Sequence, residues 1–206
     1  MAQTLKPEVR ELIIASAKKE FLENGYENAS MRTIAKNSNM TVGNLYRYFE
    51  NKEDIHSQII SSTLKKMNNA YNKLSDLDLS LETRVFDVRF NTFDLENKLD
   101  EFAHDLVDIY FENKTEFNIV FLQSSFKDNM IDWFNKLIKN LISVIYGNNI
   151  GTKGIDLLSA SISNSFFEGL RLIFFNNDSD DKNLVDIVNL YFNSYVYMLN
   201  NKVNNK

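Results

Sequence analysis

The 206-residue sequence has no cysteine, one proline, six glycines and two histidines. The absence of cysteine excludes disulfide bonds, thiolate metal sites and a cysteine nucleophile. Two histidines leave little room for a hydrolytic triad or a three-histidine metal site, and the glycine motifs of phosphate and dinucleotide sites are missing. We therefore expect no cofactor and no metal. So few prolines and glycines also leave few hairpin turns, which favours helices joined by short polar connections.

Long apolar runs are missing as well. The N-terminal stretch MAQTLKPEVRE lacks the apolar segment of a signal peptide, and no run approaches the roughly 18 apolar residues of a membrane span. Hydrophobic residues make up 44% of the chain and charged residues 25%, as in ordinary globular proteins. A cytoplasmic protein without a membrane segment is expected.

Charge is unevenly distributed along the chain. Residues 1–75 carry eleven Lys and Arg against eight Asp and Glu, a net charge of +3, whereas residues 76–206 carry twelve against twenty, a net charge of −8. This asymmetry suggests that the two parts have different roles. The charge asymmetry supports a functional assignment only in combination with a motif.

The first 40 residues predict two helices. Apolar residues recur at three- and four-residue spacing from Pro7 until Gly25, where glycine provides a left-handed stop. Ser30 is then a suitable N-cap for a helix of barely two turns. That helix is expected to end near Asn39, because asparagine tolerates a left-handed backbone that most residues resist.

Two more helices follow. Thr41 is a suitable N-cap for a short third helix, although Gly43 stands near its start and glycine inside a helix costs roughly 1 kcal/mol relative to alanine. Asn51 caps a fourth helix, residues 52–74, with acidic residues in its first turn. The glycine needs a reason outside ordinary helix packing.

Two short helices separated by a turn of about three residues are typical of a helix-turn-helix, whose second helix enters the major groove of DNA. A glycine there lets the backbone approach DNA closely. Spacing alone also allows a small helical bundle with half-buried tyrosines. The residues suited to base edges are Val42, Asn44 and Tyr46, and those suited to phosphates are Arg47, Tyr48 and Lys52, with backbone amides near Ser30 and Asn51.

Residues 13–55 resemble the DNA-binding domain of the TetR family of bacterial transcriptional regulators. The resemblance covers about the first quarter of the chain and rests on features in register: Ala17, Phe21, Gly25, Ile34, Ala35, Thr41, Gly43, Leu45, Tyr46, Phe49, Lys52 and Glu53. Two departures are Asn39, where the family usually has glycine, and Val42, where a polar or basic residue is common. The resemblance implies that bases are contacted by Val42, Gly43 and Tyr46, and phosphates by Ser30, Arg32, Arg47, Tyr48 and Lys52. We also count Asn44 among the base-facing candidates and Thr41 among the phosphate candidates.

The resemblance further implies an all-α fold with two parts. Residues 1–51 would form the helix-turn-helix domain, and residues 52–206 an all-helical domain that binds a small molecule and dimerises through its last two helices, with helix 52–74 as the link. A two-fold dimer would place its recognition helices roughly 34 Å apart, so a near-palindromic operator is expected. Small residues and an apolar stripe predict the dimer contact, with an intramolecular core as the alternative: Ser161, Ser165, Leu184, Ile187, Val188, Tyr191 and Tyr195.

Aromatic residues crowd the middle of the second part. We interpret them as the lining of an apolar ligand cavity with polar handles, although each is also compatible with a plain core: His104, Tyr110, Phe117, Phe121, Trp133 and Phe167. Ligand occupancy is hypothesised to change the separation of the recognition helices. The segment 75–96 is the least legible, because residues 86–90 alternate as in a strand; we interpret it as irregular or helical.

We therefore interpret the chain as a homodimeric, ligand-responsive transcriptional regulator, expected to be a repressor and not an enzyme, with a double-stranded DNA operator and an unidentified small-molecule effector as partners. A DNA-binding protein of chromosome organisation or cell division is an alternative. A di-iron bundle enzyme is a further one, because Glu53-x-x-His56 and Glu101-x-x-His104 are the motifs that it needs. The short helices before Glu53 leave no room for its long antiparallel pairs.

Overall fold

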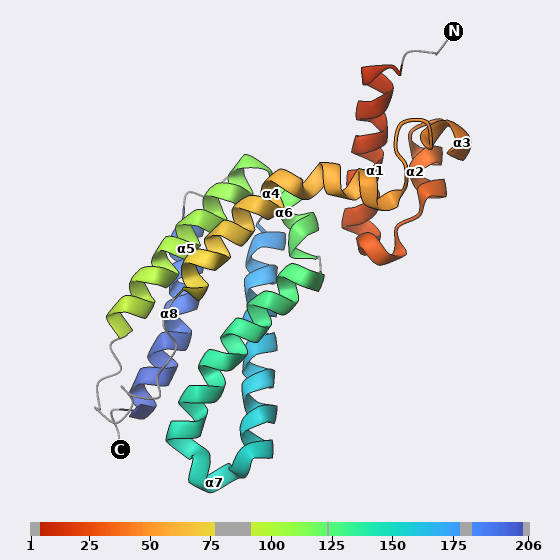
Figure 1. The fold of residues 1–206 in the computed structure, drawn as a ribbon. Coiled ribbons are helices and arrows are strands. Elements are labelled where there is room, and N and C mark those ends of the chain that lie inside the picture. The colour runs from red at the N-terminus through yellow and green to blue at the C-terminus, as the bar shows by residue number, and fades with distance from the viewer. Residues whose placement is uncertain (1–4, 77–91, 123, 178–182, 204–206) are drawn as a thin grey trace. The chain divides into compact units, whose positions relative to one another are not determined.

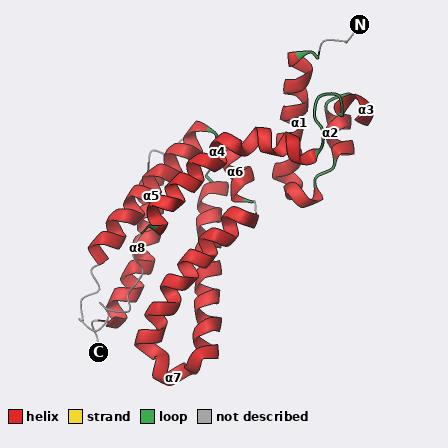
Figure 2. Cartoon of the chain, viewed as in Figure 1, coloured by secondary structure: helices red, strands yellow, loops and turns green. Residues whose placement is uncertain are grey.

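The structure is a computed structural model, and it describes residues 5–76, 92–122, 124–177 and 183–203. Within these ranges every regular element is an α-helix, which confirms the predicted all-α class (Figure 2). The alternating residues 86–90 lie outside the described residues.

The chain forms two compact units, Met1–Lys66 with Glu112–Ser124, and Met67–Phe111 with Ser125–Lys206. The predicted boundary after residue 51 stays a prediction; α4 (Lys52–Ser75) runs from one unit into the other.

The first unit begins with α1 (Pro7–Asn28), which has a proline in its first turn (Figure 1). Gly25 has φ +70°, a value that glycine adopts without strain, and the helix bends there. The expected stop at Gly25 is therefore a kink, after which a short helical stretch continues to Asn28. The buried face of α1 carries Ile13, Ala17 and Phe21.

The turn after α2 (Met31–Asn37) is closed by a left-handed residue. Ser30 caps α2 as expected, and Asn39 has φ +56°. Asn39 N–H donates to the Lys36 carbonyl at 3.1 Å and Met40 N–H donates to the Ala35 carbonyl at 2.9 Å. This pair of bonds is the usual way in which a left-handed residue ends a helix. Asparagine thus supplies the conformation for which glycine is the common choice.

The next two caps also agree with the sequence. Thr41 Oγ1 accepts a hydrogen bond from Asn44 N–H at 3.2 Å at the start of α3 (Val42–Leu45). Asn51 Oδ1 accepts from Asp54 N–H at 2.8 Å at the start of α4. The remaining helix of this unit, α6 (Lys114–Phe121), packs against α1.

The second unit contains the rest of α4 together with α5 (Thr92–Glu112), α7 (Ser124–Phe175) and α8 (Leu184–Val203). Gly151, with φ +63°, divides α7 into two arms that Figure 1 draws as a helical hairpin. Phe134 of the first arm stacks on Phe166 of the second, with ring centroids 3.9 Å apart. The Phe192 ring of α8 lies 5.6 Å from Phe166 and 6.0 Å from Phe102 of α5. Three helices therefore share one aromatic core.

Within the described residues, no helix combines the length and the apolar character needed to cross a membrane.

Candidate nucleic-acid interface

The predicted recognition helix has a buried and an exposed side. Leu45 and, one turn later, Phe49 are buried, which fastens α3 and the turns after it to the unit. On the other side, the Tyr46 side chain is 51% exposed. The remaining residues predicted to face bases are exposed or half-buried: Val42, Gly43 and Asn44. The structure thus brings all four base-facing candidates to one short element.

Neither packing nor backbone conformation in the described chain explains why position 43 is a glycine. A Cβ atom at this position would meet nothing within 4 Å, and Gly43 does not have a positive φ. Alanine would fit here and would favour the helix by roughly 1 kcal/mol. No described residue therefore accounts for a glycine at this position.

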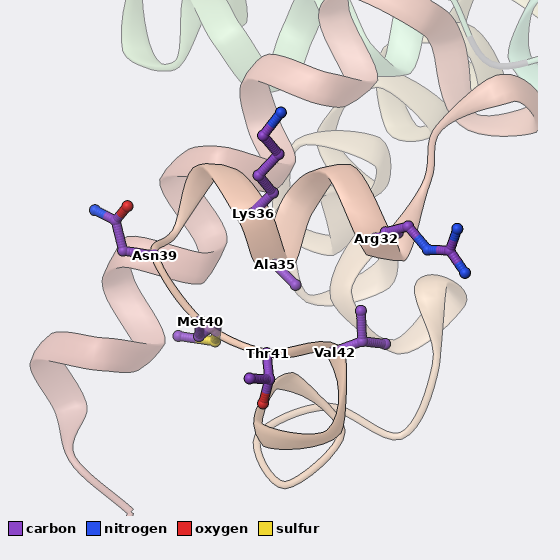
Figure 3. A pocket seen from close by; sticks show the side chains of 7 residues that line it. All are labelled: Arg32, Ala35, Lys36, Asn39, Met40, Thr41 and Val42. Carbon is purple, nitrogen blue, oxygen red and sulfur yellow. The ribbon is translucent and has the colours of Figure 1, made fainter.

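A cationic groove lies between α2 and the start of α3 (Figure 3). Its volume is about 460 Å³. Figure 3 shows Arg32, Ala35 and Lys36 on α2, with the Lys36 side chain directed away from the stretch that leads into α3. The groove combines an apolar floor with two exposed cations, and its lining residues are Arg32, Ala35, Lys36, Asn39, Met40, Thr41 and Val42.

Sequence reasoning identified Arg32, Thr41 and Val42 in this groove but missed Lys36 and Met40. The signal for Lys36 was available, because residues four apart lie on the same face of a helix and Lys36 follows Arg32 at that spacing. Met40 gave no comparable signal, since its place depends on the turn geometry at Asn39.

The hydroxyl oxygens of two phosphate candidates act as helix caps. Ser30 Oγ accepts from Thr33 N–H at 3.5 Å, and Thr41 Oγ1 caps α3. A capping hydroxyl still has its own O–H to donate to a phosphate oxygen. The backbone N–H of Ser30 is engaged differently, because it donates to the carboxylate of Glu20 at 3.0 Å.

The last three phosphate candidates differ in their surroundings. Arg47 is exposed. The Tyr48 hydroxyl accepts a hydrogen bond from Lys6 N–H at 3.3 Å. Lys52 Nζ donates to three main-chain carbonyls, those of Tyr26, Glu27 and Ala29. Lys52 is therefore bound within the chain.

The residues predicted to line a ligand cavity do not lie in one unit. Tyr110, Trp133 and Phe167 are buried in the second unit, where the Trp133 indole N–H has no hydrogen-bond partner among the described residues. Phe117 and Phe121 are buried in α6, which belongs to the first unit. The sixth residue, His104, is exposed, and its Nδ1 lies 2.9 Å from the Asp100 carbonyl.

The predicted dimer residues divide into two faces. Leu184 and Val188 are buried in the core of the chain itself, and Tyr191 and Tyr195 are half-buried. The exposed members are Ser161, Ser165 and Ile187.

Further exposed apolar residues accompany them. Leu190 is 73% exposed and lies three residues after Ile187, and Tyr197 extends the same face of α8. Leu157 is exposed on α7, one turn before Ser161. Sequence reasoning missed these residues because the apolar stripe of α8 spans two faces, and periodicity does not say which face another helix of the same chain covers.

The two histidine motifs lie in different units. His56 is buried between the rings of Phe21 and Tyr26, whose centroids are 5.0 Å and 4.5 Å away. Burial lowers the pKa of His56; the Glu53 carboxylate opposes this shift and the Lys52 ammonium adds to it. Among the described residues, no three His, Asp or Glu side chains gather as metal ligands.

The chain is similar in sequence to known HTH-type transcriptional regulators. Residues 13–59 match the model of the bacterial regulatory proteins of the tetR family. The chain is 30% identical over 169 residues to an HTH-type transcriptional regulator of Staphylococcus aureus. This match covers 78% of this chain and 80% of that protein. It is 36% identical over 58 residues to an uncharacterized HTH-type transcriptional regulator of Bacillus subtilis. This match covers 28% of this chain and 30% of that protein. A solved TetR-like transcriptional regulator from Rhodococcus has a TM-score of 0.49 and 12% identity, with 95% of this chain and 99% of that chain covered.

Proposed function

This chain belongs to the TetR family of helix-turn-helix transcriptional regulators, and we propose that it is a ligand-responsive repressor that binds a near-palindromic operator as a homodimer in the bacterial cytoplasm. The observation that carries the DNA-binding part of the proposal is Gly43. Gly43 is exposed, has open space around it and serves no packing purpose in the described chain. A closely approaching DNA duplex is the neighbour that would require it.

The proposed DNA interface extends from the recognition helix across the groove. Tyr46 and Asn44 read base edges, and the Val42 methyl groups contact a thymine methyl. Arg32 and Lys36 hold phosphates on the α2 side of the groove, where they are the exposed cations. Arg47, Tyr48 and the capping hydroxyls of Ser30 and Thr41 add further phosphate contacts.

The proposed dimer contact uses the exposed apolar face of α8 and the second arm of α7. Ile187, Leu190 and Tyr197 lie on one side of α8, and Leu157 is exposed on α7. Ser161 and Ser165 are small and donate their hydroxyls to carbonyls of their own helix, at 2.8 Å and 2.9 Å. Small residues with internally satisfied hydroxyls allow a partner helix to approach. Two helices from each subunit would form a four-helix contact.

The proposed effector site lies in the second unit, beside Tyr110, Trp133 and Phe167. A buried indole N–H without a partner in the described chain is suited to a ligand acceptor, because an unpaired buried donor is costly. The Phe134 ring, whose centroid lies 6.4 Å from that of Trp133, would supply apolar surface. Occupancy would be transmitted through α6, which follows α5 and precedes α7 in the chain but packs with α1.

DNA binding can be tested with a duplex that the wild-type chain enriches from a random-sequence library. The affinity for this duplex is compared with that for scrambled DNA over a series of salt concentrations. We expect Tyr46→Ala to abolish the preference. Arg32→Gln should weaken binding to both. It removes one phosphate contact from each subunit of the dimer and should therefore reduce the slope of log K against log salt by about 1.8, or about 0.9 per contact. A wild-type chain that prefers no duplex would refute the proposal.

Regulation and ligand response need separate measurements. Genome-wide mapping of bound sites should give peaks near promoters; sites scattered over coding regions would instead indicate chromosome organisation. Trp133 is the single tryptophan, so its fluorescence reports on the second unit. A compound that alters Trp133 emission should also change affinity for the enriched duplex. A compound that binds the dimer and leaves that affinity unchanged would contradict the proposed coupling.

A further inference from the structure

Lys52 is the first residue of α4, and its ammonium group lies within a set of main-chain carbonyls. Its Nζ is 2.6 Å from the Tyr26 oxygen, 3.0 Å from that of Glu27 and 3.1 Å from that of Ala29. A lysine ammonium has three N–H donors, so these three acceptors use all of them. Nζ also lies 4.6 Å from the centroid of the Tyr26 ring, within the range of a cation–π contact.

The three carbonyls belong to the end of α1. Tyr26 and Glu27 lie after the kink at Gly25, and Ala29 is the residue that follows the helix. The last carbonyls of a helix lack partners within the helix, and the negative end of the helix dipole favours a cation there. Lys52 therefore supplies, from the start of α4, the donors that the end of α1 needs.

The next residue along the connection, Ser30, is held by a side chain of opposite charge. Ser30 N–H donates to the Glu20 carboxylate at 3.0 Å, and Glu20 is only 4% exposed. The carbonyl of Ala29 and the N–H of its successor are thus fixed by two charged side chains, a cation and an anion. The helix α2 begins immediately afterwards at Met31 and carries Arg32 into the groove.

We propose that Lys52 is a positioning residue for DNA binding: its ammonium group fixes the connection between α1 and α2, and with it the placement of α2, and it holds no operator phosphate. This inference rests on the proposed DNA-binding function. A phosphate contact would have to replace three hydrogen bonds from a charged donor and would leave three carbonyls without their partner. The placement of α2 matters for DNA binding because α2 forms one wall of the groove.

Two substitutions in the full chain separate the positioning role from a phosphate contact. Lys52→Met keeps most of the side-chain length and removes the charge. Lys52→Arg keeps the charge but spreads the donors over a planar fork, which suits a phosphate and does not converge on three carbonyls from one point. Lys36→Met is the matched control, because Lys36 is an exposed lysine of the groove.

Thermal unfolding without DNA and affinity for the enriched duplex over a salt series are the two measurements. We expect Lys52→Met to lower the unfolding temperature and to weaken binding by the same factor at every salt concentration, so that the slope of log K against log salt is unchanged. Lys52→Arg should fail to restore either property. Lys36→Met removes one phosphate contact from each subunit, so it should reduce the slope by about 1.8 and leave the unfolding temperature unchanged.

Any of three results would overturn the inference: a reduced salt slope for Lys52→Met, an unchanged unfolding temperature or affinity for that variant, or full recovery of both properties in Lys52→Arg. Should Lys52→Met not fold, Lys52→Arg alone decides, since a phosphate contact predicts wild-type stability and affinity for it. If the wild-type chain prefers no duplex, the proposed function fails. The unfolding temperatures then still test whether Lys52 fixes the connection.

Discussion

Tyr191 of α8 lies directly against Gly169 of α7, so that a Cβ atom at Gly169 would stand 2.7 Å from the ring carbon Cζ and closer still to the hydroxyl. The tyrosine is held in place, because its hydroxyl donates to the Phe166 carbonyl at 2.9 Å and lies 3.2 Å from the Tyr195 hydroxyl. Burial, together with the hydrogen bond to Tyr195, raises the pKa of Tyr191, so the phenol remains neutral at physiological pH.

Gly169→Ala should therefore destabilise the protein. Displacing Tyr191 from its hydrogen bonds resembles the overpacking of a core, which typically costs about 1–3 kcal/mol and here outweighs the roughly 1 kcal/mol that alanine gains in a helix. Urea unfolding at a fixed protein concentration measures the difference. Equal or greater stability of the variant would show that Tyr191 moves aside without cost.

Gly43→Ala is the opposite case and serves as the matched control. Because a Cβ atom at Gly43 meets nothing within 4 Å, the free protein should be as stable as the wild type or more stable by up to about 1 kcal/mol. Its affinity for the enriched duplex should nevertheless fall, since the new methyl group would meet the DNA. A variant that binds the duplex as tightly as the wild type would remove the main support for the proposed interface.

The burial of His56 predicts a pH-dependent stability. Its pKa is lowered in the folded chain, mainly by burial, so the unfolded chain binds a proton more readily. The free energy of unfolding should be undiminished above about 6.5, the ordinary pKa, and should decline as the pH falls from there through the lowered pKa of the folded state. His56→Phe should flatten this decline. His104→Gln, at an exposed position, should leave it unchanged; a decline of equal size in all three proteins would assign it to other groups.

The ion pair between Lys18 of α1 and Glu116 of α6 should contribute measurably to stability. The two side chains are 32% and 14% exposed, whereas the pair of Lys19 with Glu23, 3.8 Å apart on α1, is 69% and 58% exposed. A double-mutant cycle with Lys18→Met and Glu116→Gln should give a coupling energy of about 1 kcal/mol. The control cycle at Lys19 and Glu23 should give about 0.3 kcal/mol. Equal values would mean that partial burial adds nothing to the pair.

The helix caps and the turn of the DNA-binding region were predictable from sequence because their chemistry is local. Ser30, Thr41 and Asn51 each accept a hydrogen bond from an N–H three residues later, as expected of N-caps. Asn39 adopts the left-handed conformation for which asparagine and glycine are suited. Each feature depends on residues within one turn of the chain.

The features that escaped sequence reasoning depend on residues that are distant in the chain. Lys52 has a charged side chain of the kind that binds phosphates, so the sequence suggested that role. Its carbonyl partners lie 23 to 26 residues earlier in the chain and could not be identified from the sequence. Periodicity identified the apolar residues of α8 but not the face on which Ile187 and Leu190 remain exposed. The burial of Phe117 and Phe121 was expected in a ligand cavity, whereas α6 packs with α1.

The position of α6 also restricts how this protein can change by recombination. The polypeptide passes between its two compact units at residues 66–67, 111–112 and 124–125. A single crossover that exchanged the N-terminal helices for those of a relative would join a foreign α1 to the resident α6, and would pair Lys18 or its substitute with an unmatched residue at position 116. An exchange of the first unit therefore keeps its contacts only if α1 and α6 are inherited together, although more than 80 residues separate them.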